Sequence, residues 1–286
     1  MNADALPSLK SLLEREGLWA RKSLGQHFLL DLDLTRRIAR AAGDLAGKTV
    51  IEIGPGPGGL TRALLEAGAD PVIAVEKDPR FIAILAELIP WSDGRLRIIE
   101  GDASDVDEAA LVDDALGAPI VANLPYNVGT ALLVKWLKAG AWRGPMTLMF
   151  QLEVAERIVA APGADAYGRL AVLAQAVTRA RIVLRVPPRA FTPPPKVASA
   201  VVHLVDRADR FADLDALERV TAAAFGQRRK MLRSSFASLA GPASESLLTA
   251  AGIAPTERAE QVDVAAFCRL ATLWRAHQSG GAQVSS

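Results

Sequence analysis

The sequence predicts an α/β fold in which a mostly parallel sheet is followed by a smaller all-helical domain. Short β-branched runs alternate with helix-like stretches between residues 48 and 120, which is the pattern of βα units. Polar motifs come directly after these runs, and open α/β sheets bind ligands at the carboxyl ends of their strands. Beyond residue 206 the pattern is helical, with no strand signal. The ligand site is therefore expected in the first part of the chain.

Apolar runs and their spacing define the expected elements in order along the chain. The expected strands are Thr49–Ile53, Pro71–Val75, Arg95–Ile99, Pro119–Ala122, Met146–Phe150, Ile182–Val186 and Ala198–Val205. The expected helices are Leu60–Ala67, Phe81–Ile89, Gln151–Ala160, Leu214–Phe225, Arg229–Leu239, Ser244–Ala251 and Val264–His277. Leu170–Thr178 is an apolar stretch without a clear period, and Pro187–Pro195 is a proline-rich loop.

The charged run Asp206–Arg210 has the composition of a linker, so we expect a domain boundary near residue 206. Residues 1–206 then form the α/β domain, and residues 207–286 form the helical domain. The segment Gln278–Ser286 is rich in Gly, Ala, Gln and Ser, a composition that predicts a disordered tail.

The composition excludes several classes of protein. The chain has 286 residues and a formal net charge of +1. Because Cys268 is the only cysteine and the three histidines are scattered, we expect no internal disulfide and no metal. Acidic residues interrupt the N-terminus, and no run reaches the ~18 apolar residues of a membrane span, so we expect neither a signal peptide nor a membrane partner. We therefore expect a cytoplasmic protein, and we expect a monomer.

A glycine-rich loop and two acidic residues predict a nucleotide-like ligand. Gly54, Gly56 and Gly59 lie between a strand and a helix, where glycine lets the backbone approach a ligand closely. Glu76 ends the second strand and can accept hydrogen bonds from both ribose hydroxyls. Asp102 follows the third strand and can accept a hydrogen bond from the exocyclic amine of adenine. The loop also satisfies the dinucleotide pattern, so these residues alone do not separate an NAD enzyme from a methyltransferase.

The segment Asn123–Asn127, after the fourth strand, favours chemistry on an amine. The lone pair of an adenine N6 amine is delocalised into the ring, which makes the amine a poor nucleophile. The Asn123 side-chain oxygen and the Leu124 carbonyl can each accept one N–H and so localise that lone pair. Pro125 stiffens the backbone, and Tyr126 can stack on the base, a contact that contributes about 1–3 kcal/mol. No strong base is needed when the methyl donor is a sulfonium.

At this point the sequence resembles the ribosomal RNA adenine N6-dimethyltransferase family, and in particular its bacterial small-subunit branch. The resemblance runs from Lys22 to about Val205. The motifs that carry it are Ser23–Leu29, the glycine loop, Val75–Asp78, Gly101–Ala103, Asn123–Asn127, Gln151–Ala155, Ala166–Leu170 and Phe191–Val197.

The resemblance implies a Rossmann-like class I methyltransferase sheet that binds S-adenosyl-L-methionine. It implies that the cofactor is contacted by His27, Leu29, Gly54, Glu76, Asp102 and Asn123. It also implies that Asn123, Leu124, Pro125 and Tyr126 are catalytic, with Phe191 facing Tyr126 across the target base. His27 departs from the pattern, since Asn is usual at this position in the bacterial enzymes. A histidine still donates a hydrogen bond, so we expect cofactor binding to be kept.

The implied substrate is 16S rRNA within the small (30S) ribosomal subunit, at two adjacent adenines near the 3′ end that become N6,N6-dimethyladenosine. The helical domain is then expected to help bind RNA. Basic clusters that could contact phosphates are Arg228–Lys230 with Arg233, and Arg36, Arg37 and Arg40 with Arg21 and Lys22.

Four alternatives remain open from the sequence. One of them, a DNA adenine methyltransferase, is disfavoured because such enzymes carry a separate base-reading domain that 286 residues are too few to hold. A resistance-type relative would methylate an adenine of large-subunit RNA, but its proline-rich loop and C-terminal segment differ from Phe191–Val205. A hydride-transferring NAD enzyme leaves Asn123–Tyr126 without a role. A non-catalytic ribosome-assembly factor on the same fold is disfavoured because the catalytic motif is intact.

Overall fold

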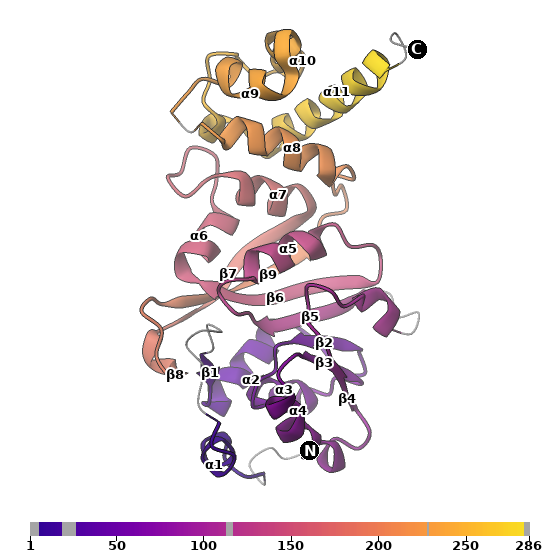
Figure 1. Ribbon diagram of the computed structural model, residues 1–286, viewed down its shortest axis with the longest axis vertical. Helices are drawn as coiled ribbons and strands as arrows, with labels where there is room; N and C mark the ends of the chain where they lie inside the picture. Colours follow the sequence, from indigo (N-terminus) through magenta and orange to yellow (C-terminus); the bar gives the residue numbers. More distant parts are fainter. Residues whose placement is uncertain (1–5, 19–26, 113–116, 228, 283–286) are drawn as a thin grey trace. The chain divides into compact units, whose positions relative to one another are not determined.

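The computed structural model describes residues 6–18, 27–112, 117–227 and 229–282. Contacts divide the chain into two compact units. One consists of Met1–Ala155 and Arg181–Val205, and the other of Glu156–Ala180 and Asp206–Ser286. The first contains most of a β-sheet and the second is largely helical (Figure 1). The motif Ser23–Gln26 and the basic residues Arg21 and Lys22 lie outside the described residues.

Within the described residues, a seven-stranded sheet has the order β4-β3-β2-β5-β6-β9-β7. Its strands are β2 (Val50–Ile53), β3 (Val72–Glu76), β4 (Leu96–Glu100), β5 (Ala118–Asn123), β6 (Arg143–Gln151), β7 (Thr178–Val186) and β9 (Ser199–Asp206). The five strands from β4 to β6 are parallel to their neighbours, and β9 is antiparallel to β6. Because β2 lies between β3 and β5, the strand order reverses there, and ligands of such sheets bind at that point.

Among the described residues, six helices accompany this sheet along the chain, and the last of them, α6, spans the division between the two units. They are α1 (Leu9–Arg15), α2 (Leu32–Ala41), α3 (Gly59–Glu66), α4 (Pro79–Ala86), α5 (Gly129–Leu137) and α6 (Leu152–Val159). A large core joins α2 and α3 to alternate residues of the strands, such as Val72 and Ala74 of β3. A second core joins α1 to α4 around Phe28 and Phe81. A small antiparallel pair of β1 (Phe28–Leu29) and β8 (Phe191–Thr192) adds to this unit.

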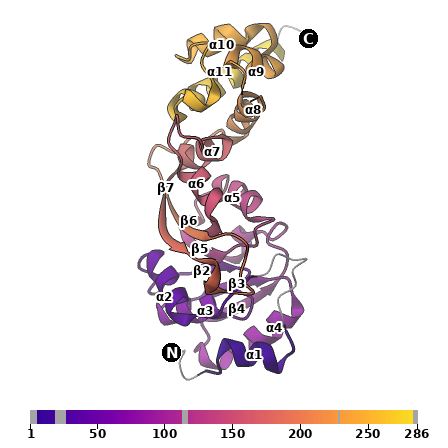
Figure 2. The same ribbon diagram turned by 90° about the vertical axis from the view of Figure 1, so that its left-hand side faces the viewer.

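The second unit contains α7 (Arg169–Val177), α8 (Leu214–Phe225), α9 (Leu232–Ala240), α10 (Ser244–Ala250) and α11 (Val264–Ala282) (Figure 2). Its aromatic contacts join Tyr167 to Phe225 and Phe225 to Phe267, with ring centroids 6.1 and 5.5 Å apart. The Tyr167 hydroxyl donates a hydrogen bond to the Val262 carbonyl at 3.0 Å. None of the helices that the structure describes combines the length and the apolar character that crossing a bilayer requires.

The α/β fold with a helical C-terminal region is confirmed, and each of the seven expected strands is present within a few residues of its expected bounds. The division into units differs from a single boundary at residue 206, because Glu156–Ala180 belongs to the helical unit. The reason is packing: α7 lies against α8 and α11, and Gly163 donates a backbone hydrogen bond to Glu260. Leu170–Thr178, whose period was unclear, is mostly helix α7.

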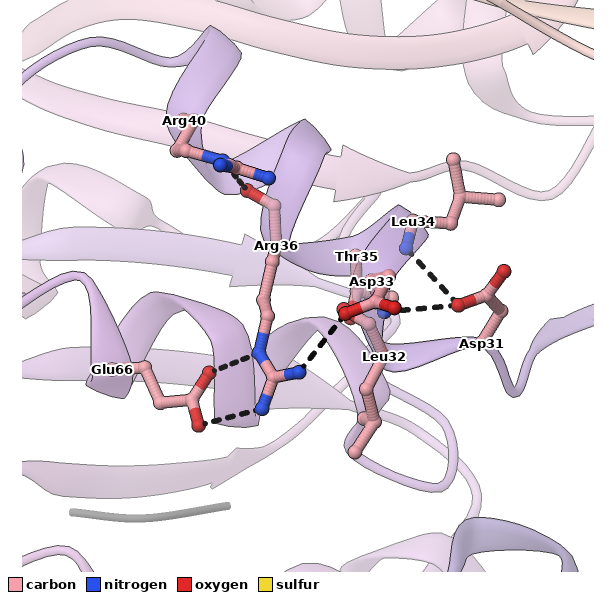
Figure 3. A network of polar contacts seen from close by, with 8 residues as sticks. All are labelled: Asp31, Leu32, Asp33, Leu34, Thr35, Arg36, Arg40 and Glu66. Atoms are coloured by element: carbon pink, nitrogen blue, oxygen red, sulfur yellow. Dashed lines mark hydrogen bonds and ion pairs between the residues drawn. The ribbon is translucent and has the colours of Figure 1, made fainter. Parts of the chain in front are cut away.

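A bidentate ion pair fastens α2 to α3 (Figure 3). Arg36 donates from Nε and Nη2 to the two carboxylate oxygens of Glu66, at 2.8 and 3.1 Å. Its Nη1 donates to Asp33 at 3.1 Å. The Arg36 guanidinium is therefore occupied within the protein, which removes it from the residues proposed to contact phosphate, whereas the side chains of Arg37 and Arg40 are exposed.

Candidate active site

The sequence-predicted site residues converge on one cavity at the carboxyl ends of the parallel strands. The cavity has a volume of about 400 Å³. Nine predicted residues line it: His27, Leu29, Gly54, Glu76, Asp102, Asn123, Leu124, Pro125 and Tyr126. They come from four strand ends and from β1, so residues nearly 100 positions apart in the chain meet here. Phe191 is the one predicted site residue that does not line the cavity.

The glycine loop forms one wall of this cavity between β2 and α3. Gly54 and Gly56 have φ of +65° and +54°. This is a left-handed backbone conformation, which residues other than glycine adopt only with steric strain. A Cβ built on Gly54 would meet no atom within 4 Å, so the space beside this backbone is open. At Gly59 a Cβ would approach the Leu29 carbonyl to 2.8 Å. Gly59 therefore allows α3 to lie against β1, and Gly54 leaves room for a ligand.

Glu76 at the end of β3 is a buried carboxylate that organises this wall. One of its oxygens accepts a hydrogen bond from Gly56 N at 3.0 Å, and the other accepts from Lys77 N and Asp78 N at 2.9 Å each. Burial raises the pKa of Glu76, while these three N–H groups favour the charged form. Two carboxylate oxygens offer about four acceptor sites, so capacity remains for a ligand hydroxyl.

Asp102 follows β4 and is a charged acceptor that lines the same cavity as the glycine loop. Its carboxylate accepts hydrogen bonds from Ser104 N at 2.9 Å and from Lys77 Nζ at 3.3 Å. The Ser104 backbone contact, more than Lys77, holds the pKa of Asp102 below its ordinary value. Asp102 is thus ionised at neutral pH and suited to receive an N–H donor.

The segment Asn123–Tyr126 leaves β5 through a turn that leads into α5. The Pro125 carbonyl accepts hydrogen bonds from Val128 N and Gly129 N, at 3.2 and 3.1 Å. The Asn123 side chain donates from Nδ2 to the His27 carbonyl at 3.1 Å. The Tyr126 hydroxyl is 2.7 Å from Ser199 Oγ, and burial raises the pKa of Tyr126, so the phenol is neutral. These contacts fix the side chains at both ends of the motif.

His27 lies beside the aromatic side chains of the site. Its Nδ1 is 2.8 Å from the Pro193 carbonyl, which can only accept, so Nδ1 is the donor of this hydrogen bond. The His27 ring centroid is 5.5 Å from that of Tyr126 and 6.4 Å from that of Phe191. Phe191 is 3% exposed and belongs to the main core, paired with Leu29 across β1 and β8. That Phe191 faces Tyr126 across a base stays a prediction.

Glu52, in the middle of the buried strand β2, also lines the cavity and was missed by sequence reasoning. It is 1% exposed, and no described residue makes a hydrogen bond of good geometry to either carboxyl oxygen. Burial raises the pKa of Glu52 to about 8; Thr61 opposes this shift and the charge of Glu76 reinforces it. Glu52 is therefore a neutral acid at pH 7. The feature of the sequence that could have identified Glu52 is an acidic residue within an otherwise apolar strand run.

The fold is that of a nucleotide-cofactor enzyme of the α/β class, and Asn123–Tyr126, the motif expected to bind an amine, lines the cavity at its strand ends. The chain belongs to the ribosomal RNA adenine dimethylase family, whose sequence model matches residues 17–275. The family resemblance inferred from the motifs is thereby confirmed.

Relatives and solved structures agree with this placement. The chain is 59% identical to the ribosomal RNA small subunit methyltransferase A of Mesorhizobium japonicum, over 94% of this chain and 99% of that protein. It is also 59% identical to the protein of the same name from Phenylobacterium zucineum, over 99% and 98% of the two chains.

Among solved structures, it is similar to a dimethyladenosine transferase from Plasmodium falciparum, with a TM-score of 0.73, 25% identity and coverage of 89% and 98%. It is also similar to the 23S rRNA methyltransferase ErmE, with a TM-score of 0.65, 26% identity and coverage of 87% and 99%. Both similarities extend over most of the chain, so the Rossmann-like methyltransferase fold is confirmed.

Proposed function

We propose that this chain transfers methyl groups from S-adenosyl-L-methionine to N6 of two adjacent adenines near the 3′ end of 16S rRNA in the small ribosomal subunit, giving N6,N6-dimethyladenosine. The observation that carries this proposal is that Asn123–Tyr126 line the same cavity as Gly54, Glu76 and Asp102, with the Asn123 amide oriented by His27. The enzyme acts in ribosome biogenesis as a monomer in the cytoplasm.

The cavity fits the cofactor by its shape and its hydrogen-bonding groups. The open face of Gly54 admits the ligand close to the backbone, and Glu76 has remaining acceptor capacity for the ribose hydroxyls. Asp102 is an ionised acceptor for the exocyclic amine of the adenine ring. His27, Leu29 and Asn123, which line the same cavity, would also contact the cofactor. The bound cofactor supplies an electrophilic methyl group on a sulfonium.

The protein's part in catalysis is to make the target amine nucleophilic. Because Nδ2 of Asn123 is engaged by the His27 carbonyl, Oδ1 is the atom left to accept an N–H of adenine. The Leu124 carbonyl accepts the second N–H, and Pro125 restrains the backbone that carries it. Tyr126, whose hydroxyl is held by Ser199, stacks on the base. With both N–H groups bound, the lone pair localises on N6. As the N–C bond forms, the S–C bond of the sulfonium would break to leave a neutral thioether, and N6 then loses one proton to solvent.

The target adenine must leave its base stack to reach this site. A paired and stacked base cannot present N6 to a cavity at the edge of a sheet, so the substrate adenine lies in a loop or is splayed out. With a net charge of +1, the protein offers few phosphate contacts, and specificity then comes from the shape of a folded ribosomal particle. The exposed Arg229 and Lys230 of the helical unit are the proposed phosphate contacts there.

Mass spectrometry of nucleosides tests this function directly. Partly assembled small subunits, mature large subunits and naked 16S rRNA are each incubated with the enzyme and cofactor. We expect N6,N6-dimethyladenosine at two adjacent positions of the small-subunit particle, and far less product on naked RNA. Modification of large-subunit RNA, or a product that stops at one methyl group, would instead support a resistance-type activity.

A further inference from the structure

An ion-pair cluster outside the predicted site holds the loop that carries Asp102. Lys135, on helix α5, donates from Nζ to the Ala103 carbonyl at 2.8 Å, the Val106 carbonyl at 2.6 Å and Glu108 Oε1 at 3.0 Å. An ammonium group has three N–H donors, so these contacts use all of them. Lys135 is therefore directed at the protein's own loop and not at a ligand.

Glu108, the acidic residue of this cluster, also accepts a hydrogen bond from a second side chain of α5. The Glu108 side chain is 2% exposed, and its Oε1 also accepts a hydrogen bond from Trp136 Nε1 at 2.9 Å. Trp136 is fully buried in α5. Two consecutive residues of one helix thus hold Glu108 at the start of the 3₁₀ turn η4 (Glu108–Leu111). We refer to Lys135, Glu108 and Trp136 as the Lys135 cluster.

The loop held by the cluster is the one that shapes Asp102. The Asp102 carbonyl accepts hydrogen bonds from Asp105 N and Val106 N at 2.9 and 3.0 Å, and its carboxylate accepts from Ser104 N. The carbonyls of Ala103 and Val106, which lie in the same turn, are those that Lys135 binds. Loss of the ammonium would leave two carbonyls and a carboxylate close together without a cation, so the turn would rearrange and move the Asp102 carboxylate.

Stability alone does not account for this arrangement. A buried ion pair typically adds little net stability compared with apolar residues of similar volume. Here two of the three hydrogen bonds of Lys135 go to main-chain carbonyls of the turn and not to Glu108. The geometry is that of a clamp on a turn whose first residue, the half-buried Asp102, lines the cofactor cavity.

We propose that Lys135 is a positioning residue for recognition of the cofactor's adenine base. Together with Glu108 and Trp136, it holds the turn after β4 so that the Asp102 carboxylate meets the exocyclic amine. This inference rests on the proposed role of Asp102 in the cofactor site. It identifies helix α5, which directly follows Asn123–Asn127, as the support of both the catalytic segment and the adenine pocket.

The test measures discrimination between two bases and not affinity alone. Calorimetry gives the dissociation constants of S-adenosylhomocysteine and of S-inosylhomocysteine, in which a carbonyl oxygen replaces the exocyclic amine. Wild type should prefer the adenine compound by about tenfold or more, because the carboxylate accepts from an amine but repels a carbonyl. Asp102→Asn should lose most of this preference, since an amide can accept from one and donate to the other.

The decisive variants are Lys135→Met and the double variant Lys135→Met with Glu108→Gln. The double variant avoids an unpaired buried carboxylate and keeps an oxygen that accepts from Trp136 Nε1. It is therefore expected to fold even if the single variant does not. Both should lower the base preference to about threefold or less. Lys138→Met, three residues further along and exposed, is the matched control and should keep the wild-type preference.

The outcomes separate the two proposals. If wild type itself shows no base preference, the role of Asp102 in the proposed function fails. If wild type and Asp102→Asn behave as expected but the Lys135 variants keep the full preference, Lys135 does not position Asp102. Equal weakening of both ligands with an unchanged preference, or failure of both variants to fold, would mean that the cluster serves the fold only, and would overturn the inference.

Discussion

The side-chain amide of Asn123 donates a hydrogen bond to the main-chain carbonyl of His27, with Nδ2 and O 3.1 Å apart. The two residues are 96 positions apart in the chain, so the contact exists only because β1 folds against the end of β5. It fixes which end of the amide accepts. An Asn whose nitrogen is engaged by a carbonyl keeps its oxygen as the acceptor, which is what the proposed activation of an amine requires.

Replacement of Glu76 tests the cofactor site. Glu76→Gln removes the charge and one acceptor, and should weaken S-adenosyl-L-methionine binding by about tenfold or more, because a hydrogen bond to a charged group is lost. Calorimetry measures the dissociation constant. Glu100→Gln is the control, since Glu100 is exposed and lies in register with Glu76 on the next strand. Unchanged cofactor binding in Glu76→Gln, or binding of NAD by wild type, would contradict the assignment.

Two substitutions of Tyr126 separate stacking from hydrogen bonding. Tyr126→Phe loses only the contact with Ser199 and should retain turnover within a few-fold. Tyr126→Ala loses the ring, and transfer at limiting RNA concentration should fall about 5- to 150-fold, as expected for about 1–3 kcal/mol of base stacking. Rates on small-subunit particles provide the measurement. Equal activity of the Ala and Phe variants would show that the ring does not contact the base.

The basic residues before α9 should determine the salt dependence of RNA binding. Replacing Arg228, Arg229 and Lys230 with Ala should reduce the slope of log affinity against log salt concentration by about 2–3, because each phosphate contact contributes just under one. Cofactor affinity should stay the same. Arg36→Ala is the contrasting variant: since Arg36 pairs with Glu66, it should lower the midpoint of thermal unfolding and leave the salt slope as in wild type. A reduced salt slope in Arg36→Ala, with an unchanged slope in the triple variant, would instead place the RNA-binding surface on α2.

The buried acid Glu52 should make stability depend on pH. Its pKa is about 8 in the folded protein and has an ordinary value of 4.5, so between these pH values the folded state retains a proton that the unfolded state releases. The free energy of unfolding should therefore fall as pH rises from 4.5 to about 8. In Glu52→Gln this contribution is absent. Denaturant unfolding at pH 5 and pH 8 measures the free energy of unfolding of wild type and Glu52→Gln. The same pH dependence in both proteins would contradict the raised pKa of Glu52.

The sequence predicted well those features that depend on local pattern. The parallel strands read as β-branched runs, and Gly54, Glu76, Asp102 and Asn123 follow them, so their convergence followed from the rule for strand ends. Helices α2 and α5 were not identified. Segment 129–137 is almost entirely apolar apart from Lys135, which leaves little amphipathic period to detect.

Features that depend on distant partners could not be predicted. The core position of Phe191 results from its pairing with Leu29 across β1 and β8, and nothing near Phe191 in the sequence indicates that partner. The membership of Glu156–Ala180 in the helical unit follows from packing of α7 on α8 and α11, which lie much further along the chain. The neutral state of Glu52 depends on full burial, which composition does not reveal.

The most direct test of the central claim is the rate of methyl transfer by Asn123→Ala on small-subunit particles under single-turnover conditions. We expect the rate to fall by about 100-fold or more, the scale seen when one aimed polar group is removed from an active site. RNA affinity and the midpoint of thermal unfolding should remain close to wild type. Near-wild-type transfer by Asn123→Ala would show that the adenine amine is activated elsewhere.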